Sequence, residues 1–256
     1  MSQTRFSLHF DPIGDVLAAA KACEEAVFLQ AYGNTAEQWC DEYERYDPAS
    51  VFITVLEPLG DAVATCRLIL PSAVGLKSLI DTEGEPWFVD ANRSAAEVGM
   101  SPGQTVDVAT LAVRRGAAGA GLLAAALYHG IVLATRANWL RWIVMIIDAR
   151  ARRLLSMLDL EVRVLPGAMA APYLGSSASI PIWADVPRLL RDQRNVNPDG
   201  HRMIEGGIGL DAIAIPNVSD FVVRPRALTM PASFVPLAHD QDDDLTRSDY
   251  RPRLIA

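Results

Sequence analysis

A glycine-rich turn between a strand and a long apolar helix is the feature that most limits what this chain can fold into. Residues 104–113 (QTVDVATLAV) are typical of a strand, RRGAAGAG spans 114–121, and a helix is predicted over 122–138. Such a turn brings several backbone N–H groups and the positive end of the helix to one point, which is what a pyrophosphate requires. The same small residues would also let the helix pack closely on a sheet, so both a phosphate site and a packing turn are open at this point.

The elements around this unit predict a mixed sheet. The runs VFITVLE and AVATCRLIL, separated by Pro-Leu-Gly-Asp, are typical of an antiparallel hairpin, and WIVMII is typical of a buried strand. Asp148 after that strand would suit the ribose ligand of a dinucleotide-binding Rossmann unit, but the glycine order of that fingerprint is not met. Further helices are predicted at 15–29, 35–44 with Thr35 as N-cap, 74–80, 149–158, 185–194 and near His201, and further strands at 161–165 and 180–183, with a loop up to 102 and irregular structure from 216.

Two segments resemble GNAT acyltransferases. LAVRRGAAGAGLL is similar to the strand, arginine-glycine loop and helix that hold coenzyme A or a carrier protein's phosphopantetheine in that family. DARARRLLSMLDL resembles the family's Asn-x-x-Ala-x-x-Leu-Tyr-x-x-x-Gly-Phe helix, with Leu155 at the tyrosine that protonates the leaving thiolate and Asp159 at the glycine. The resemblance implies an α/β fold with a mixed, mostly antiparallel central sheet flanked by helices. It also implies that the acyl-thioester or phosphopantetheine is bound by Leu111, Val113, Arg114, Arg115, Gly116, Gly119, Ala120 and Gly121.

The first half of the chain resembles one branch of that superfamily, the acyl-homoserine-lactone synthases and N-acyl amino acid synthases. The matching segments are EYERYDPASVFITV, ATCRLILPS with GLKSLID, and VDVATLAV. They place Glu44, Asp47 and Asp107 at the branch's acidic positions and Arg67 at its arginine. The branch has an arginine where this chain has Glu24, and its Ser-Arg pair is replaced by Ala109 and Thr110. These departures predict that the acceptor is not S-adenosylmethionine.

The resemblance implies an N-acyltransferase that moves an acyl group from acyl-CoA or an acyl carrier protein to the amine of a small molecule. Glu44, Asp47 and Asp107 are the candidate catalytic carboxylates, and Arg67 is expected to pair with Glu44 or Asp47 and to shape the acceptor pocket. The backbone of the central strand would stabilise the oxyanion. Two alternatives stay open, a catalytically silent acyl-CoA-binding or regulatory protein of the same fold and a nucleotide-dependent oxidoreductase.

Charge and residue counts exclude several classes. A net charge of -8 and a pI near 5.0 argue against a general nucleic-acid binder. Residues 114–163 nevertheless hold eight arginines and three acids, a local excess of +5 that suits the phosphates of coenzyme A or an acidic carrier protein. Three cysteines without CxxC spacing predict neither disulfides nor zinc, and the scattered histidines predict no metal site. His129 is expected to be a satisfied core residue.

The chain is expected to form a GNAT-like core over 1–170, a C-terminal extension packed on it over 171–225, and an irregular acidic tail over 226–256. Twenty residues between Arg115 and Arg136 carry no formal charge, which is the length of a membrane span. Their alanine content and His129 favour a buried core helix instead. No signal-peptide pattern begins the sequence, so we expect a cytoplasmic protein without a membrane partner, and a homo-oligomer is left open.

Overall fold

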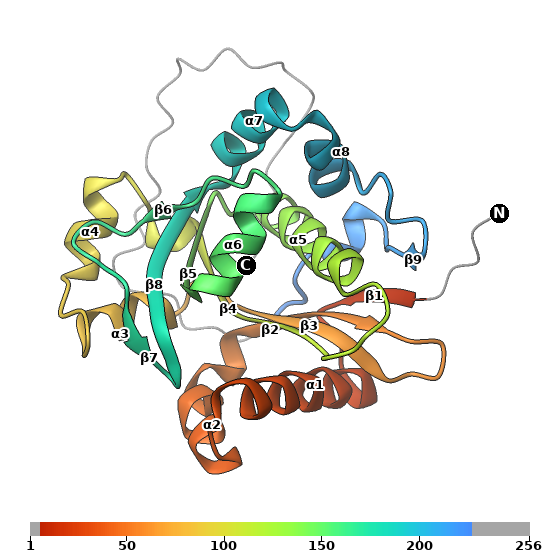
Figure 1. Ribbon diagram of the computed structural model, residues 1–256, viewed down its shortest axis with the longest axis horizontal. Coiled ribbons are helices and arrows are strands. Elements are labelled where there is room, and N and C mark those ends of the chain that lie inside the picture. Colours follow the sequence, from red (N-terminus) through yellow and green to blue (C-terminus); the bar gives the residue numbers. More distant parts are fainter. Residues whose placement is uncertain (1–5, 227–256) are drawn as a thin grey trace.

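The computed structural model describes residues 6–226, which form a nine-stranded sheet with helices on both faces (Figure 1). The strand order is β6-β8-β5-β4-β3-β2-β1-β9, and β7 pairs with β8 outside this path. Among the described strand pairs, β4–β5 and β1–β9 are parallel and the others are antiparallel. The strands are β1 Phe6–Phe10, β2 Ser50–Leu56, β3 Ala62–Ile69, β4 Thr105–Val113, β5 Trp142–Asp148, β6 Arg163–Val164, β7 Ala171–Tyr173, β8 Ser176–Asp185 and β9 Ile213–Ala214.

The mixed, mostly antiparallel sheet confirms the fold class that the sequence predicted. It also removes the Rossmann alternative, since a dinucleotide-binding domain needs a doubly wound parallel sheet. The helices are α1 Gly14–Tyr32, α2 Ala36–Tyr43, α3 Lys77–Glu83, α4 Ala91–Glu97, α5 Ala120–Ala137, α6 Ala149–Met157, α7 Val186–Val196 and α8 Pro198–Gly206, with 3₁₀ turns η1 Glu44–Ala49, η2 Pro102–Gln104 and η3 Val218–Phe221.

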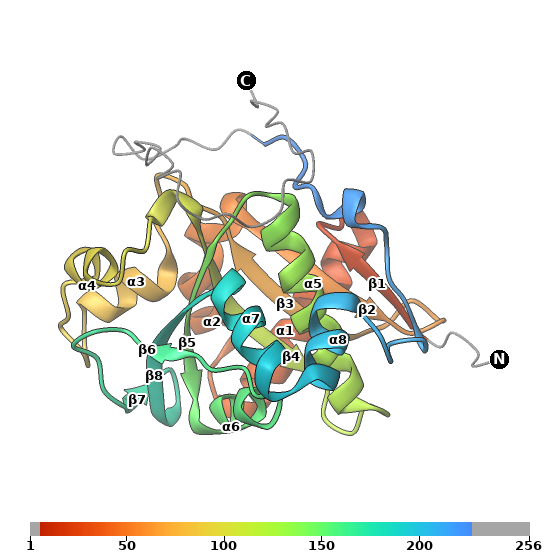
Figure 2. The same cartoon turned by 90° about the horizontal axis from the view of Figure 1, so that it is seen from above.

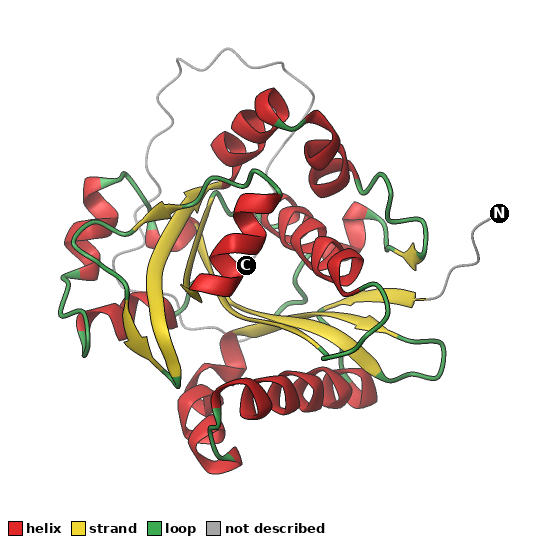
Figure 3. Cartoon of the chain, in the orientation of Figure 1, coloured by secondary structure: helices red, strands yellow, loops and turns green. Residues whose placement is uncertain are grey.

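The helices cover opposite faces of the sheet, and strand alternation decides which face each residue meets. Figure 3 shows α1 and α2 below the sheet and α5 and α6 above it, while Figure 2 places α3 and α4 at one end and β1 at the other. In β5, Ile143 and Met145 join the core beneath α5 and α6, whereas Trp142 and Val144 pack against α3 and α4. Both faces of the central strands are buried, which explains why their sequences are nearly continuous apolar runs.

The sequence missed several elements at the edges of this sheet. Strands β1 and β9, which pair with each other, were not predicted, and α4 lies in the segment expected to be a loop. Strand β8 lies between β5 and β6, so the sheet continues across the domain boundary expected at residue 170. Arg224 and Arg226 both bind Asp11 beside β1, which ties the end of the extension to the start of the chain. Of the acidic tail expected over 226–256, only Arg226 lies within the described residues.

Helix α5 is long and apolar enough to cross a membrane by length and composition, and it is the one such helix among the described residues. In the structure 61% of its apolar window is buried, and it packs against the sheet and against α8. His129 on this helix hydrogen-bonds the carbonyl oxygen of Ile204 at 2.9 Å and is buried, which confirms the prediction of a satisfied core histidine.

Candidate functional site

The glycine-rich turn joins the end of β4 to the start of α5 and lies on the surface. Gly116 and Gly119 have φ values of +79° and +74°, the left-handed region that glycine adopts at least cost. A Cβ atom built on Gly116 or Gly121 would meet nothing within 4 Å, and one on Gly119 would meet only Leu122 of the same helix, at 3.9 Å. The glycines therefore do not serve close packing of the helix on the sheet. They leave the backbone of the turn open to a ligand.

The first turn of α5 offers donors that no described side chain uses. Gly119 is the N-cap residue and has no side-chain cap, and the first turn contains no acidic residue. The helix begins at Ala120 and not at residue 122 as predicted, so Ala120 and Gly121 belong to its first turn. Their N–H groups point toward the N-terminal end, where the helix dipole favours an anion. Arg114 and Arg115 are exposed beside them.

Strands β4 and β5 pair only at their beginnings and then separate. Thr105, Val106 and Asp107 pair with residues 142–144, whereas β4 stays paired with β3 as far as Val113 and β5 stays paired with β8 as far as Asp148. Figure 1 shows the two strands diverging in this way. We call this opening the β4–β5 fork: its apex lies at Asp107, and the glycine-rich turn lies at its mouth. Backbone groups of 108–113 that face β5 have no partner in that strand.

A β-bulge marks β4 beside the apex of the fork. Arg67 pairs with Thr110 and Leu68 pairs with Val108, so Ala109 has no partner in the β3–β4 register. An extra residue of this kind bends the strand and takes its backbone out of the ladder. Leu111 and Val113, which the sequence predicted to bind the acyl-thioester, follow the bulge, and both are partly buried against the main core.

Asp107 at the apex is fully buried and is held by one neighbour. Its Oδ2 accepts a 2.5 Å hydrogen bond from the backbone N–H of Ser78, and its Oδ1 accepts a 2.7 Å bond from the Ser78 hydroxyl. Burial raises the pKa of Asp107 to about 7, against the lowering effect of the two Ser78 hydrogen bonds and the positive charge of Lys77. A carboxyl group that titrates near neutral pH is suited to acid–base chemistry.

Arg67 lies at the centre of a second buried cluster, on the α1 side of the sheet. Its guanidinium is bonded to Glu24 of α1 through Nε and Nη2, the latter at 2.7 Å, and its Nη1 donates to Asp47 at 2.7 Å. Glu24 also accepts a hydrogen bond from the Thr110 hydroxyl. Lys21 binds the other oxygen of Asp47 at 2.5 Å. Each of the three nitrogen atoms of the Arg67 guanidinium thus donates a hydrogen bond to a carboxylate of the same chain.

This cluster separates the predicted carboxylates from one another. Asp47 pairs with Arg67 as expected; although burial opposes it, hydrogen bonds from Lys21 and Arg67 lower the pKa of Asp47. Of the two partners expected for Arg67, the structure has Asp47, whereas Glu44 is exposed at the start of η1 and makes no described contact with Arg67. The main partner, Glu24, was noted in the sequence only as a departure from the arginine of the motif that the segment resembles. Thr110, a second departure, is hydrogen-bonded to it.

A third polar cluster lies next to Asp107 and was not predicted. Lys77, the residue before Ser78, is buried and bonds to Glu42 of α2, to Asp81 of α3 and to the Tyr173 hydroxyl of β7, the last at 2.9 Å. Tyr173 also donates to Asp81. Burial, the nearby charge of Asp81 and the bond to it raise the pKa of Tyr173 far above its usual value. No sequence spacing relates these three elements, which is why the pattern alone could not find the cluster.

Helix α6 begins at the end of β5, where Asp148 accepts a 2.7 Å hydrogen bond from the N–H of Ala151 as the N-cap. The Tyr32 hydroxyl, from the end of α1, also binds Asp148, at 3.0 Å. Leu155, at the tyrosine position of the motif that this helix resembles, is buried in the main core, and Asp159, at the glycine position of that motif, has a positive φ of +52°. The backbone therefore keeps the conformation that favours glycine while a tyrosine hydroxyl is missing from α6.

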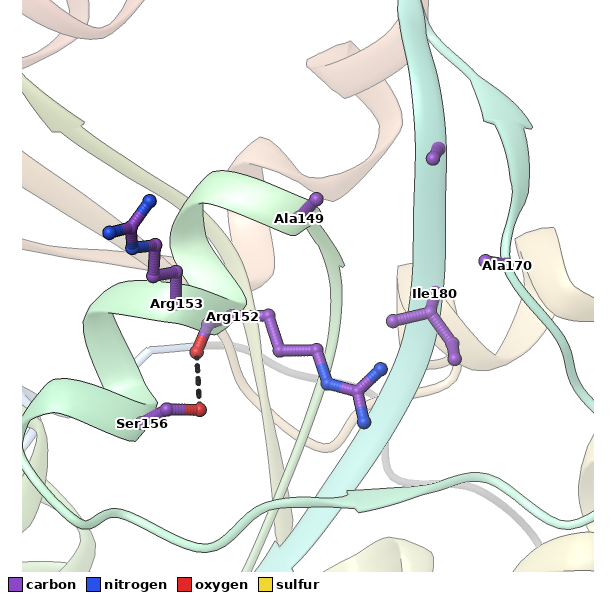
Figure 4. Close-up of a pocket in the computed structure, with 7 residues that line it drawn as sticks. Ala149, Arg152, Arg153, Ser156, Ala170 and Ile180 are labelled. Carbon is purple, nitrogen blue, oxygen red and sulfur yellow. Dashed lines mark hydrogen bonds between the residues drawn. The ribbon is translucent and has the colours of Figure 1, made fainter.

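A pocket of about 360 Å³ lies beside α6, on the side of β8 (Figure 4). In Figure 4 Arg152 extends toward Ile180 of β8, and Arg153 extends the other way. The pocket contains no residue of the predicted donor turn or of the candidate carboxylates. Its lining residues are Ala149, Arg152, Arg153, Ser156, Ala170, Ala178 and Ile180.

The arginine-rich block of 114–163 is only partly neutralised by the fold. Arg136 pairs with Glu205 and Arg141 pairs with Asp185, both at 2.8 Å. The other six arginines of the block form no ion pair with any described residue. Within residues 6–226, no group of three or more histidine, cysteine or acidic side chains is arranged to hold a metal ion.

No family profile and no curated protein matches this chain in sequence, but its fold matches solved structures. FeeM, an N-acyl amino acid synthase from uncultured soil microbes, superposes with a TM-score of 0.55 at 14% identity, over 73% of this chain and 94% of its own. A Lactobacillus plantarum protein classed as an N-acetyltransferase gives 0.50 at 15% identity, over 71% and 99%. This chain has a GNAT-like fold. This chain also superposes on BjaI, a CoA-dependent acyl-homoserine lactone synthase, with a TM-score of 0.52 at 15% identity, over 84% of this chain and 97% of BjaI. At such identities the likeness concerns the fold, and the activity must be argued from the site.

Proposed function

We propose that this protein is an N-acyltransferase that moves an acyl group from an acyl-thioester to the amine of a small molecule. The observation that carries the proposal is the β4–β5 fork, with an open glycine turn at its mouth and a buried carboxyl group of raised pKa at its apex. The named activities of proteins with similar folds, acyl-homoserine lactone synthesis and N-acyl amino acid synthesis, support the same reaction class.

The donor would bind along the fork. A pantetheine chain is extended and carries two amide groups, so it can pair with the unpaired backbone of 108–113 as an added strand would. The phosphate at its end would then meet the N–H groups of Gly119, Ala120 and Gly121, with Arg114 and Arg115 beside it. Coenzyme A and a carrier protein share this phosphopantetheine arm. The unpaired arginines suit either of them.

The reaction needs a group that accepts a proton, because an amine is protonated near neutral pH. The amine nitrogen attacks the thioester carbon, the carbon–sulfur bond breaks, and the thiolate leaves and takes a proton from solvent, since α6 offers Leu155 in place of a tyrosine. Of the three candidate acids, Asp47 is already neutralised by Lys21 and Arg67, and Glu44 is exposed outside these clusters. Asp107 is therefore the proposed general base, directly or through one water molecule. The N–H of Ala109 at the bulge is the proposed oxyanion donor.

The test is a thioester-cleavage assay on the full chain. Acetyl-, octanoyl- and palmitoyl-CoA would each be incubated with a panel of amino acids and amines, with thiol release and product mass measured. We expect thiol release that depends on one class of amine and that falls roughly 10²-fold in Asp107→Asn. Glu44→Gln is the matched control and should keep its turnover. Unchanged turnover in Asp107→Asn would remove Asp107 from the mechanism.

One observation favours a second candidate, a catalytically silent acyl-CoA-binding protein. Asp107 is fully buried with both oxygens bonded to Ser78, an arrangement that also caps helix α3, and α6 carries no tyrosine hydroxyl. Such a protein would retain an acyl-thioester without cleaving it. Calorimetric binding of acyl-CoA with no thiol release from any amine tested would favour this candidate over the enzyme.

S-adenosylmethionine is not the proposed acceptor. Thr110 donates a hydrogen bond to Glu24, and Glu24 in turn binds Arg67; both residues stand where the synthase branch that the sequence resembles has arginine. The proposed acceptor pocket around Arg67 thus has a carboxylate and a hydroxyl group at positions where that branch has positive charges. Detection of an acyl-homoserine lactone made from S-adenosylmethionine would contradict this part of the proposal.

A further inference from the structure

We propose that Ser78 is a positioning residue that holds the carboxylate of Asp107 in its working orientation, an inference that rests on the proposed function. Ser78 donates to both oxygens at once, its backbone N–H to Oδ2 at 2.5 Å and its hydroxyl to Oδ1 at 2.7 Å. Two bonds to two different oxygens fix both the position and the rotation of a carboxylate, because neither oxygen can turn away without losing a partner.

Capping of helix α3 accounts for the hydrogen bond from the backbone N–H of Ser78 but not for the one from its hydroxyl. Helix α3 begins at Lys77 after Leu76, whose side chain makes no cap, so Asp107 supplies the missing acceptor from strand β4. The backbone N–H of Ser78 alone would satisfy that need. The hydroxyl takes the second oxygen and leaves one lone pair on each oxygen for an incoming amine or water. It thereby couples the start of α3 to the apex of the fork.

The charged and titratable groups around Asp107 come from three elements. Lys77 and Asp81 approach it from α3, and their charges oppose each other, the lysine favouring ionisation and Asp81 disfavouring it. Tyr43 of α2 and Tyr46 of η1 also interact electrostatically with Asp107. Burial raises the pKa of both hydroxyls, that of Tyr46 to about 12, so both stay neutral near pH 7. The Ser78 hydroxyl is thus one of few groups that favour the ionised form.

The experiment compares Ser78→Ala, which removes the hydroxyl, with Ser78→Thr, which keeps one. Carboxyl-¹³C-aspartate labelling and NMR titration of the unliganded full chain would follow Asp107, assigned through Asp107→Asn. Since the lost hydrogen bond favours the charged form, we expect the titration midpoint to rise by about one pH unit in Ser78→Ala. Ser78→Thr should stay near wild type.

The same variants have a kinetic signature. The acid limb of kcat/KM should move upward with the NMR midpoint, which lowers kcat/KM about tenfold at pH 6 and leaves it nearly unchanged above pH 9. Ser94→Ala is the matched control, because the Ser94 hydroxyl is also buried and donates one hydrogen bond, to the carbonyl oxygen of Pro166. It should cost stability without moving either midpoint. If Ser78→Ala does not fold, Ser78→Cys, a weaker donor, should give a smaller shift of the same sign.

The outcomes separate this inference from the proposed function. If Asp107→Asn loses turnover but the serine variants titrate like wild type, Ser78 does not position the base and the proposed function stands. If Asp107→Asn keeps turnover, Asp107 is not the base and the inference fails with that assignment. An upward shift in both NMR and kinetics, restored by threonine, supports the inference.

Discussion

Replacing Glu24 by alanine should strongly destabilise the fold, because Glu24 neutralises an arginine that lies within the core. Arg67 is 3% exposed and Glu24 is 0% exposed, and three hydrogen bonds join them, from 2.7 to 3.2 Å. Without Glu24 the guanidinium keeps Asp47 as its one described charged partner, which it shares with Lys21, and a long 3.4 Å hydrogen bond to the Ser50 hydroxyl. Removing one partner of a buried pair costs about 3–5 kcal/mol. That is a large part of the roughly 5–15 kcal/mol by which proteins are usually stable.

The assay is urea unfolding at pH 7, followed by tryptophan fluorescence and circular dichroism. Asp192→Ala is the matched control, because Asp192 pairs with Arg188 at 3.5 Å where both side chains are about half exposed, and such surface pairs contribute about 0–1 kcal/mol. Glu24→Gln keeps the shape of the side chain and should fall between the two. The double variant Glu24→Met with Arg67→Met removes both charges and should recover much of the loss.

The reasoning about this cluster would be refuted by a specific pattern. A Glu24→Ala variant no less stable than Asp192→Ala would mean that Arg67 finds solvent or another partner. A double variant as unstable as Glu24→Ala alone would mean that the cost comes from lost packing or the lost Thr110 bond, and not from an unpaired charge.

Two further predictions concern the fork. Gly121→Leu should weaken coenzyme A binding more than tenfold in calorimetry, because the new side chain would stand where the phosphate is proposed to bind. The melting temperature should be unchanged or higher, because a Cβ at Gly121 meets nothing within 4 Å, whereas a substitution at Gly119, with its φ of +74°, would add backbone strain. Equal affinity would mean that phosphate does not approach the turn. The pKa of Asp107 is raised from 3.8 to about 7, so between these pH values the folded state binds more protons than the unfolded state. As the pH rises from about 4 to 7, the free energy of unfolding of the wild type should therefore fall relative to that of Asp107→Asn, by up to about 4 kcal/mol. Parallel pH curves in urea unfolding would contradict the raised pKa.

The candidate site was partly visible in the sequence. The glycine turn could be predicted because it is a continuous stretch, and backbone geometry fixes what a strand, glycines and a helix start can bind. Asp107 was singled out through a resemblance, but its burial and raised pKa were not, since these depend on Ser78 and Lys77 from another helix. Glu24 was noted only as a missing arginine, and its role as the partner of Arg67 became visible when α1 was placed against β3.

The sequence by itself determined the local elements and the mixed character of the sheet. Hairpin strands, the long apolar helix α5 and the helix after β5 follow from periods of 2 and 3.6 residues, which are read within a few turns of chain. The tertiary structure alone decided where β4 and β5 part, that β8 lies between β5 and β6, and that β9 pairs with β1. These pairings join residues far apart in the chain, and their register follows from the packing of both faces of the sheet, which no local period records.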